Sequence, residues 1–246
     1  MAFDNTNYKR VEYLQASSTS GTAGPYIDLN LSGSYYRFVA KGFYTATKSW
    51  QQYLYGYQQS YAEDDIRQNS NATSIRGAVR GQSATISSVA LNTDHIFELC
   101  SDPDNAYFTI DGDTRTMSVG QTFTAGARYL FACYSYSASG VAGCSNALLY
   151  YCKIYDLNGD LVRDLVPCQQ RNSPNKYGMY DTIGEQFYGT QNGYDFTGGP
   201  EVVSGCATYV KIGGTWKEAD AVYVKVGGIW TQGDMNVKIS GTWKDS

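Results

Sequence analysis

The sequence predicts an all-β protein: an antiparallel β-sandwich of jelly-roll type followed by a small β-hairpin repeat module. Three observations lead to this prediction. The 246 residues include 23 tyrosines and 26 glycines but only 17% charged residues, which suits short strands joined by tight turns. No segment keeps an apolar period of 3.6 residues over three helical turns, so we expect little helix. The length also fits one sandwich with an appendage, because all-β domains often reach about 200–250 residues.

The first part of the chain divides into short runs that are typical of strands. Residues 35–47 form the longest of them, with Phe38 and Ala40 predicted on one face. The polar segment 58–72, which contains three consecutive acidic residues at 63–65, is predicted to be a surface loop. Further strands are predicted at residues 8–14, 26–31, 50–57, 74–80, 84–90, 94–100, 106–110, 114–119 and 128–136.

The clearest hairpin lies at residues 148–166. Residues 148–156 are rich in β-branched and aromatic side chains, as strands are. Asn158-Gly159 is a typical two-residue turn, and residues 161–166 form the returning strand. Pro167 is expected to end that strand, because proline has no N–H to donate. Three short aromatic pieces follow at residues 177–181, 186–190 and 194–197.

Both ends of the predicted sandwich carry a family resemblance. Residues 153–168 read KIYD-x-NG-x-LVRD-x-VPC, and Gly-x-Tyr-Asp follows at 178–181. Near the N-terminus, Val-Glu-Tyr-Leu at 11–14 is followed by Pro-Tyr-Ile-Asp at 25–28. These stretches resemble the closing and opening parts of concanavalin-A-like (laminin-G-like) domains in structural proteins of tailed phages and prophages. The resemblance implies a jelly-roll sandwich in a virion protein, assembled in the cytoplasm of a bacterial host.

The sequence becomes repetitive after residue 203. The unit Val-Lys-Ile-Gly-Gly-Thr-Trp at 210–216 recurs in similar form at 224–230 and 237–243. Each unit predicts two strands joined by a two-residue turn, which places its lysine opposite its tryptophan. Isolated hairpins are too small to be stable alone, so we predict an assembly interface. Its residues are Lys211, Trp216, Lys225, Trp230, Lys238 and Trp243.

The predicted organisation is therefore an N-terminal arm at 1–7, a sandwich at 8–205 and a three-hairpin module at 206–246. A surface fibre or spike would be a symmetric homo-oligomer, and we favour a trimer. Its other partners would be further virion proteins.

Charge and motif content argue against several classes of function. The net charge of −4 is unlike the basic excess of nucleic-acid-binding proteins. No apolar run is long enough to cross a membrane, and no secretory leader is visible. No nucleotide-binding motif occurs, and the six cysteines lack Cys-x-x-Cys spacing, so neither a cofactor nor zinc is predicted. The cysteines are expected to be buried free thiols, and the single histidine, His95, to be structural.

The residue types can be compared with the requirements of three kinds of site: a sugar-binding site, a glycosidase site and a calcium site. Sugar binding uses aromatic faces beside polar side chains, and Trp50, Tyr53, Tyr55 and Tyr57 stand next to several glutamines. A glycosidase needs two carboxylates at a fixed separation, and no such pair is evident. Calcium prefers oxygen ligands at loops. Residues that offer such oxygens are Asp102, Asp104, Asn105, Asp111 and Asp113, although aspartate and asparagine are also ordinary turn formers.

These observations lead to one functional hypothesis and two alternatives. The hypothesis is a non-enzymatic surface protein of a tailed-phage virion, in a fibre, spike or tail, that binds glycans of the host surface. The first alternative is a purely structural virion component, such as a capsid decoration, head fibre or baseplate piece. The second is a polysaccharide-degrading enzyme.

Overall fold

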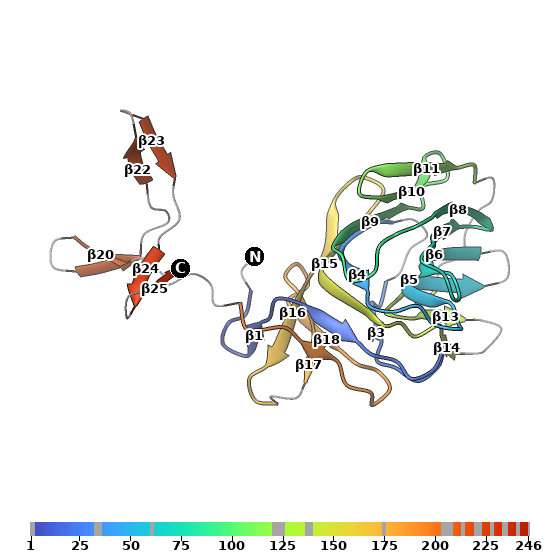
Figure 1. Ribbon diagram of the computed structural model, residues 1–246, viewed down its shortest axis with the longest axis horizontal. Coiled ribbons are helices and arrows are strands. Elements are labelled where there is room, and N and C mark those ends of the chain that lie inside the picture. The colour runs from blue at the N-terminus through green and yellow to red at the C-terminus, as the bar shows by residue number, and fades with distance from the viewer. Residues whose placement is uncertain are drawn as a thin grey trace. The chain divides into compact units, whose positions relative to one another are not determined.

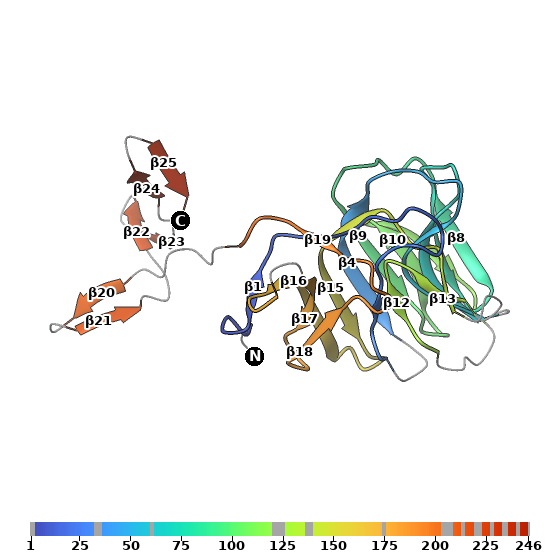
Figure 2. The same ribbon diagram turned by 90° about the horizontal axis from the view of Figure 1, so that it is seen from below.

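Alternation of apolar and polar residues produces two largely antiparallel sheets that pack face to face in the computed structural model (Figures 1 and 2). The structure describes residues 3–31, 36–59, 62–119, 126–135, 140–173 and 176–202, and the backbone of six strands within 209–245. The chain divides into two compact units, Met1–Glu201 and Val202–Ser246. The first unit is the predicted all-β sandwich. No helix among the described residues is long and apolar enough to cross a membrane.

The large sheet has eleven strands, with β15 near its middle. Its main path is β11 (Asp113–Met117), β10 (Ala106–Ile110), β9 (His95–Cys100), β4 (Arg37–Tyr44), β15 (Ala147–Tyr155), β16 (Leu161–Gln170), β17 (Tyr177–Asp181) and β18 (Gln186–Gly189). Three short strands join this path: β1 (Tyr8–Arg10), β2 (Leu14–Ala16) and β19 (Thr197–Gly198).

The small sheet has eight strands and covers the inner face of the large one. Its main path is β14 (Gly140–Ala142), β13 (Cys133–Ser135), β5 (Gln52–Gln59), β6 (Ala62–Gln68), β7 (Ile75–Val79) and β8 (Gln82–Ile86). Strands β3 (Ile27–Asp28) and β12 (Tyr129–Leu130) extend it beside β5.

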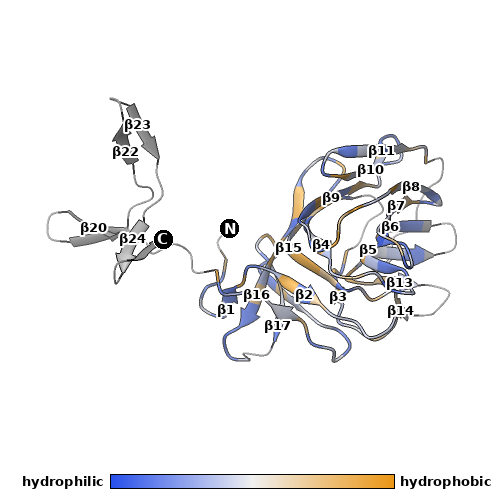
Figure 3. Ribbon diagram, in the orientation of Figure 1, coloured by the Kyte–Doolittle hydropathy of each residue, from blue (hydrophilic) through white to orange (hydrophobic). Residues whose placement is uncertain are grey.

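The core lies between the two sheets and is built from alternate residues of each strand. Along β4, every second residue is buried, and Phe38 and Ala40 face inward as predicted. Hydrophobic residues concentrate in β15 at the centre of the large sheet, whereas β11 at its edge is hydrophilic (Figure 3). Burying such apolar area contributes about 25 cal/mol per Å², so the central strands hold the sandwich together.

Strand β6 occupies part of the segment that we predicted to be a surface loop, and this prediction was wrong. Its acidic residues are buried or half-buried because arginines lie beside them. The closest atoms of these ion pairs are 2.7–3.4 Å apart, and the pairs are Asp64–Arg128, Asp65–Arg67 and Glu63–Arg76. A buried carboxylate needs such a partner, and the acidic run alone does not show that one exists.

Asp65 provides a test of this arrangement. Its side chain is fully buried, and its Oδ1 atom has no hydrogen-bond partner. Burial raises the pKa of Asp65 well above its usual value, against the opposing effect of Arg67. The folded protein binds the carboxyl proton of Asp65 more tightly than the unfolded protein does. The stability that Asp65 contributes is therefore complete below the unfolded pKa of about 3.8. It is lost as the pH rises through the raised folded pKa.

The variant Asp65→Asn should therefore gain stability relative to the parent as the pH increases. Between pH 4 and pH 8, we expect the difference in unfolding free energy between the variant and the parent to grow steadily in favour of the variant. Urea unfolding at several pH values measures it. If the difference in unfolding free energy between variant and parent does not change with pH, Asp65 has the same pKa in the folded and the unfolded protein.

Pro167 does not end β16, contrary to our expectation. The strand continues to Gln170, and Pro167 is paired with Met179 of β17. The carbonyl oxygen of Pro167 accepts a hydrogen bond from Val11 N (3.0 Å), so its missing N–H would point to the same side. On that side β16 has exchanged β15 for β1 as its neighbour. The missing N–H would point to Val11, so the proline lies at the end of the β1–β16 ladder, whose pairing stops at Arg10 and Cys168.

Five of the six cysteines lie among the described residues, and all five are buried free thiols, as predicted. Burial raises the pKa of Cys144 to about 11, so this thiol stays neutral at physiological pH. The sixth, Cys206, lies outside the described residues.

The second unit contains three separate two-stranded sheets. They are β20 (Tyr209–Ile212) with β21 (Thr215–Glu218), β22 (Tyr223–Val226) with β23 (Ile229–Gln232), and β24 (Asn236–Ile239) with β25 (Thr242–Asp245). The backbone register is the predicted one, with Lys211 opposite Trp216, Lys225 opposite Trp230 and Lys238 opposite Trp243. The side chains of these residues lie outside the description.

Candidate functional site

Strands β15 and β16 diverge within the large sheet and leave a groove at the point of divergence. They pair at residues 152–155 of β15. Towards its N-terminus β15 pairs with β2 instead, while β16 continues alongside β1. The resulting groove has a volume of about 620 Å³. It lies on the outer face of the sheet, because Cys152 and Ile154 point into the core and their neighbours along β15 point away from it.

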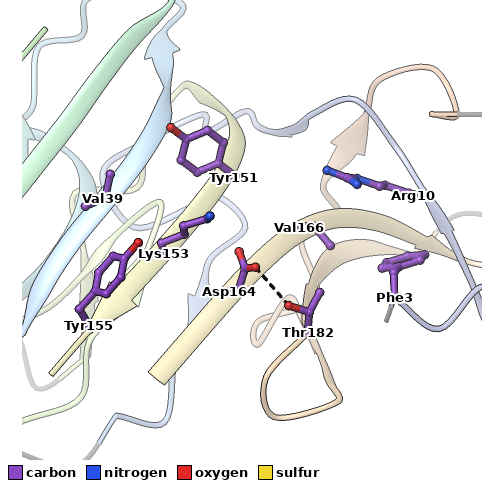
Figure 4. Close-up of a pocket in the computed structure, with 9 residues that line it drawn as sticks. All are labelled: Phe3, Arg10, Val39, Tyr151, Lys153, Tyr155, Asp164, Val166 and Thr182. Carbon is purple, nitrogen blue, oxygen red and sulfur yellow. Dashed lines mark hydrogen bonds between the residues drawn. The ribbon is translucent and has the colours of Figure 1, made fainter. Parts of the chain in front are cut away.

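Five parts of the chain line this groove (Figure 4). Strand β15 supplies an aromatic and basic row, β4 and β16 supply the rest of the floor, and the N-terminal segment and the end of β17 supply the sides. The lining residues are Phe3, Arg10, Val39, Tyr151, Lys153, Tyr155, Asp164, Val166 and Thr182.

The row on β15 follows from the alternation of a strand. Tyr151, Lys153 and Tyr155 are spaced by two and share the outer face, and all three are partly exposed. The guanidinium carbon of Arg37 lies 4.3 Å from the centroid of the Tyr155 ring, a cation–π contact that orients this ring. Arg37 is itself paired with Glu98 at 3.7 Å. The row is therefore held by neighbours on β4 and β9.

The carboxylate in the groove belongs to Asp164 on β16. Its Oδ2 atom accepts a hydrogen bond from Thr182 Oγ1 (3.3 Å), the contact drawn in Figure 4. Its backbone N–H donates to Asp181 Oδ1 (3.0 Å), which fixes the strand at this point. Asp164 is also the cross-strand partner of Lys153, yet these two side chains form no ion pair within 4 Å in the described structure.

The N-terminal segment forms one wall because its aromatic residues are anchored on β17 and β18. Phe3 meets Tyr180 edge to face at 5.2 Å, and Tyr8 stacks on Phe187 at 5.3 Å between ring centroids. Such pairs contribute about 0.5–1.5 kcal/mol beyond their area burial. Arg10 follows at the end of β1, and its exposed side chain reaches the groove from the side opposite β15 (Figure 4).

A second aromatic cluster adjoins the groove on the same face. The Lys41 ammonium lies 4.9 Å from the centre of the Tyr150 ring and 2.9 Å from Asp94 Oδ2. Burial, and then the hydrogen bond with Asp94, raise the pKa of Tyr150 to about 12. The phenol therefore remains neutral at physiological pH. A bulge at Tyr150 turns this residue to the outer face, because the pairing of β15 with β4 shifts between Leu149 and Tyr151.

The arrangement suits a polar ligand with apolar patches. Two partly exposed phenol rings can contact C–H groups, while ammonium, guanidinium, carboxylate and hydroxyl groups can bind hydroxyls. A few polar groups around aromatic side chains are typical of small-ligand sites.

The four aromatic residues predicted to bind sugar do not line this groove. Tyr53, Tyr55 and Tyr57 are at most 4% exposed, so the prediction that they present free aromatic faces was wrong. The pairing of β5 with β6 shifts between Tyr53 and Tyr55, and this bulge interrupts the period of two. Tyr55 stacks on Phe38 in the core at 4.4 Å. Trp50 is partly buried, and its Nε1 donates to the carbonyl oxygen of Cys144 (3.0 Å).

Three of the aspartates considered for calcium, Asp102, Asp111 and Asp113, have other partners. Asp102 Oδ1 accepts the backbone N–H of Asp104 (3.0 Å), and Asp113 is paired with Arg115. Asp111 Oδ2 lies 2.6 Å from Nδ1 of His95, while the other ring nitrogen of His95 contacts the carbonyl oxygen of Ala90. No group of three or more metal-binding side chains occurs in the described part of the chain. These aspartates therefore serve turns and strand ends.

Comparisons with known proteins concern the fold. No family model and no curated protein sequence matches this chain. A solved structure of the carbohydrate-binding module CBM66 from Bacillus subtilis is similar, with 9% identity and a TM-score of 0.37, over 57% of this chain and 92% of the module. Domains LG4-5 of the mouse laminin alpha1 chain are similar over 74% of this chain and 50% of theirs, with 13% identity and a TM-score of 0.42. At these values neither structure identifies a function for this chain.

Proposed function

We propose that the sandwich is a carbohydrate-binding module and that the groove between β15 and β16 is its binding site. The observation that supports this proposal is the row Tyr151, Lys153 and Tyr155, which faces Asp164 and Arg10 across the groove (Figure 4). The tyrosine rings would lie against the apolar faces of sugar rings. The charged groups around them would hydrogen-bond to hydroxyls.

We further propose that the chain acts without catalysis on the surface of a tailed-phage particle, where it binds glycans of the host. The support is the resemblance of the two ends of the sandwich, at residues 11–28 and 153–181, to phage structural proteins. The three hairpins would join the chain to other virion proteins or to further copies of itself, because two-stranded sheets are marginally stable alone. Several copies on one particle would convert a weak affinity for each sugar into useful avidity.

A glycan array and whole-cell binding assays on the full chain test the module. Tyr151→Ala and Tyr155→Ala should each weaken binding at least about tenfold, equivalent to about 1.4 kcal/mol, because each removes a ring from the groove. Tyr194→Ala is the matched control, since Tyr194 is 45% exposed and lies outside the groove. If both groove variants bind like the parent, the groove is not the sugar site.

The same assays separate the alternatives. A chain that binds no saccharide even at high surface density would favour the purely structural virion component. Release of new reducing ends from a bound glycan would favour a polysaccharide-degrading enzyme, which needs two carboxylates. Among the described lining residues, Asp164 is the one carboxylate.

A further inference from the structure

We propose that the ligand of the groove is an anionic saccharide, one that carries carboxylate, sulfate or phosphate groups. This inference rests on the proposed function, because it names the class of sugar that the same groove would bind. It starts from two cations, Arg10 and Lys153, that enter the groove from opposite sides (Figure 4).

In the described structure, these two cations lack the carboxylate partners that neighbouring cations have. On the same face of the sheet, Lys41 is 2.9 Å from a carboxylate oxygen and Arg37 is 3.7 Å from one. Arg10 and Lys153 have no carboxylate within 4 Å among the described residues. Acidic side chains outnumber basic ones in this chain, 23 to 19, yet these two cations have no acidic partner in the part that the structure describes. The groove can therefore bind a negatively charged group.

The one carboxylate of the lining does not remove this excess. Asp164 stands opposite Lys153 in the strand register, but its Oδ2 accepts the hydroxyl of Thr182. Two cations and one carboxylate leave the lining with a net charge of +1. An anionic group between β15 and β1 would meet the ammonium of Lys153 from one side and the guanidinium of Arg10 from the other. Lysine would act as a point charge, and arginine can donate two parallel hydrogen bonds to a carboxylate or phosphate.

The tyrosines determine that this anion belongs to a sugar and not to a free ion. Tyr151 and Tyr155 flank Lys153 on the same strand face, so a charged group that reaches Lys153 brings its attached ring alongside a phenol. The groove also has room for more than an ion, at about 620 Å³. The charge would thus select among saccharides, while the rings hold the sugar.

Equilibrium binding of the full chain to matched polysaccharide pairs tests this inference. The pairs are polygalacturonate with its methyl ester, dextran sulfate with dextran, and phosphomannan with mannan, so that the three anionic groups are distinguished. At least one anionic member should bind about tenfold or more tightly than its neutral partner in low salt. This preference should shrink between 50 mM and 500 mM NaCl (about 14 Å to 4 Å in screening length), because the anchoring charges are partly exposed.

Variants identify the charges responsible. Arg10→Gln and Lys153→Gln should each lower affinity for the preferred anionic member about five- to twentyfold and leave binding of the neutral member little changed. Asp164→Asn should raise affinity for the anionic member. Lys176→Gln is the matched control, because Lys176 is exposed, has no carboxylate partner among the described residues and lies outside the groove. Thermal melting verifies that each variant is folded.

The outcomes separate this inference from the proposed function. Equal binding of anionic and neutral members would overturn the inference and leave a module for neutral sugars. A preference for anionic members that survives both Arg10→Gln and Lys153→Gln would also overturn it, because the anion would then be bound by other residues. Absence of binding to every saccharide, on these pairs and on the array, would overturn the proposed function together with the inference.

Discussion

The variant Arg128→Met is expected to lower the free energy of unfolding by about 3–5 kcal/mol, as for other buried ion pairs that lose one partner. Arg128 is fully buried, and its Nε atom donates to Asp64 Oδ2 at 2.8 Å. Burial lowers the pKa of Arg128, but Tyr55 and Asp64 raise it by more, so the guanidinium stays charged. Methionine would leave the Asp64 carboxylate, which is 2% exposed, without a compensating charge.

The position of this pair explains why its loss should affect the whole sandwich. Asp64 lies on β6, Arg128 precedes β12, and the Arg128 guanidinium lies 4.8 Å from the ring of Tyr36, next to β4 of the other sheet. Urea unfolding of Arg128→Met and of the double variant Arg128→Met with Asp64→Leu measures the effect. The double variant should recover much of the loss, because neither charge of the buried Asp64–Arg128 pair remains. A single variant within about 0.5 kcal/mol of the parent would show that Asp64 reaches water or another partner.

The sequence predicts those parts of the fold that depend on residues close together in the chain, and it fails for parts that depend on distant residues. The faces of β4 are predictable because each inward residue is apolar and its neighbours are polar or partly exposed. Strand β6 is not, because three consecutive acidic residues favour a solvated loop when considered alone. Arg128, which neutralises Asp64, is 64 residues further along the chain. A buried charge is thus predictable only when its partner is known.

The candidate site shows the same division. Tyr151, Lys153 and Tyr155 lie in the segment most clearly predicted as a strand, and their spacing by two was a signal available in the sequence. The tyrosines of β5 have the same spacing, yet they are buried. Two features make the difference. The divergence of β15 and β16 exposes the row on β15, and the N-terminal segment brings Arg10 to the groove beside that row. Neither feature has a local sequence pattern.

The variant Phe108→Ala is expected to cost about 3–5 kcal/mol by removing a fully buried ring from the core. Phe108 on β10 of the large sheet packs against Gly77 on β7 of the small sheet, so closely that a Cβ atom on Gly77 would lie 2.3 Å from Cγ of the ring. Glycine is needed there because the ring of the opposite sheet occupies the space of a side chain. Gly77→Ala alone should cost about 1–3 kcal/mol through overpacking.

Together the two substitutions should cost less than the sum of their separate effects, because the added methyl group enters the cavity that the ring leaves. We expect a coupling energy of about 1–3 kcal/mol, measured by urea unfolding of the parent, both single variants and the double variant. Gly21→Ala is the matched control, since a Cβ atom there would lie 3.4 Å from Trp50 in ordinary contact, and it should change stability by less than about 0.5 kcal/mol. Additive losses would mean that Gly77 and Phe108 do not touch, and that the two sheets meet through other residues.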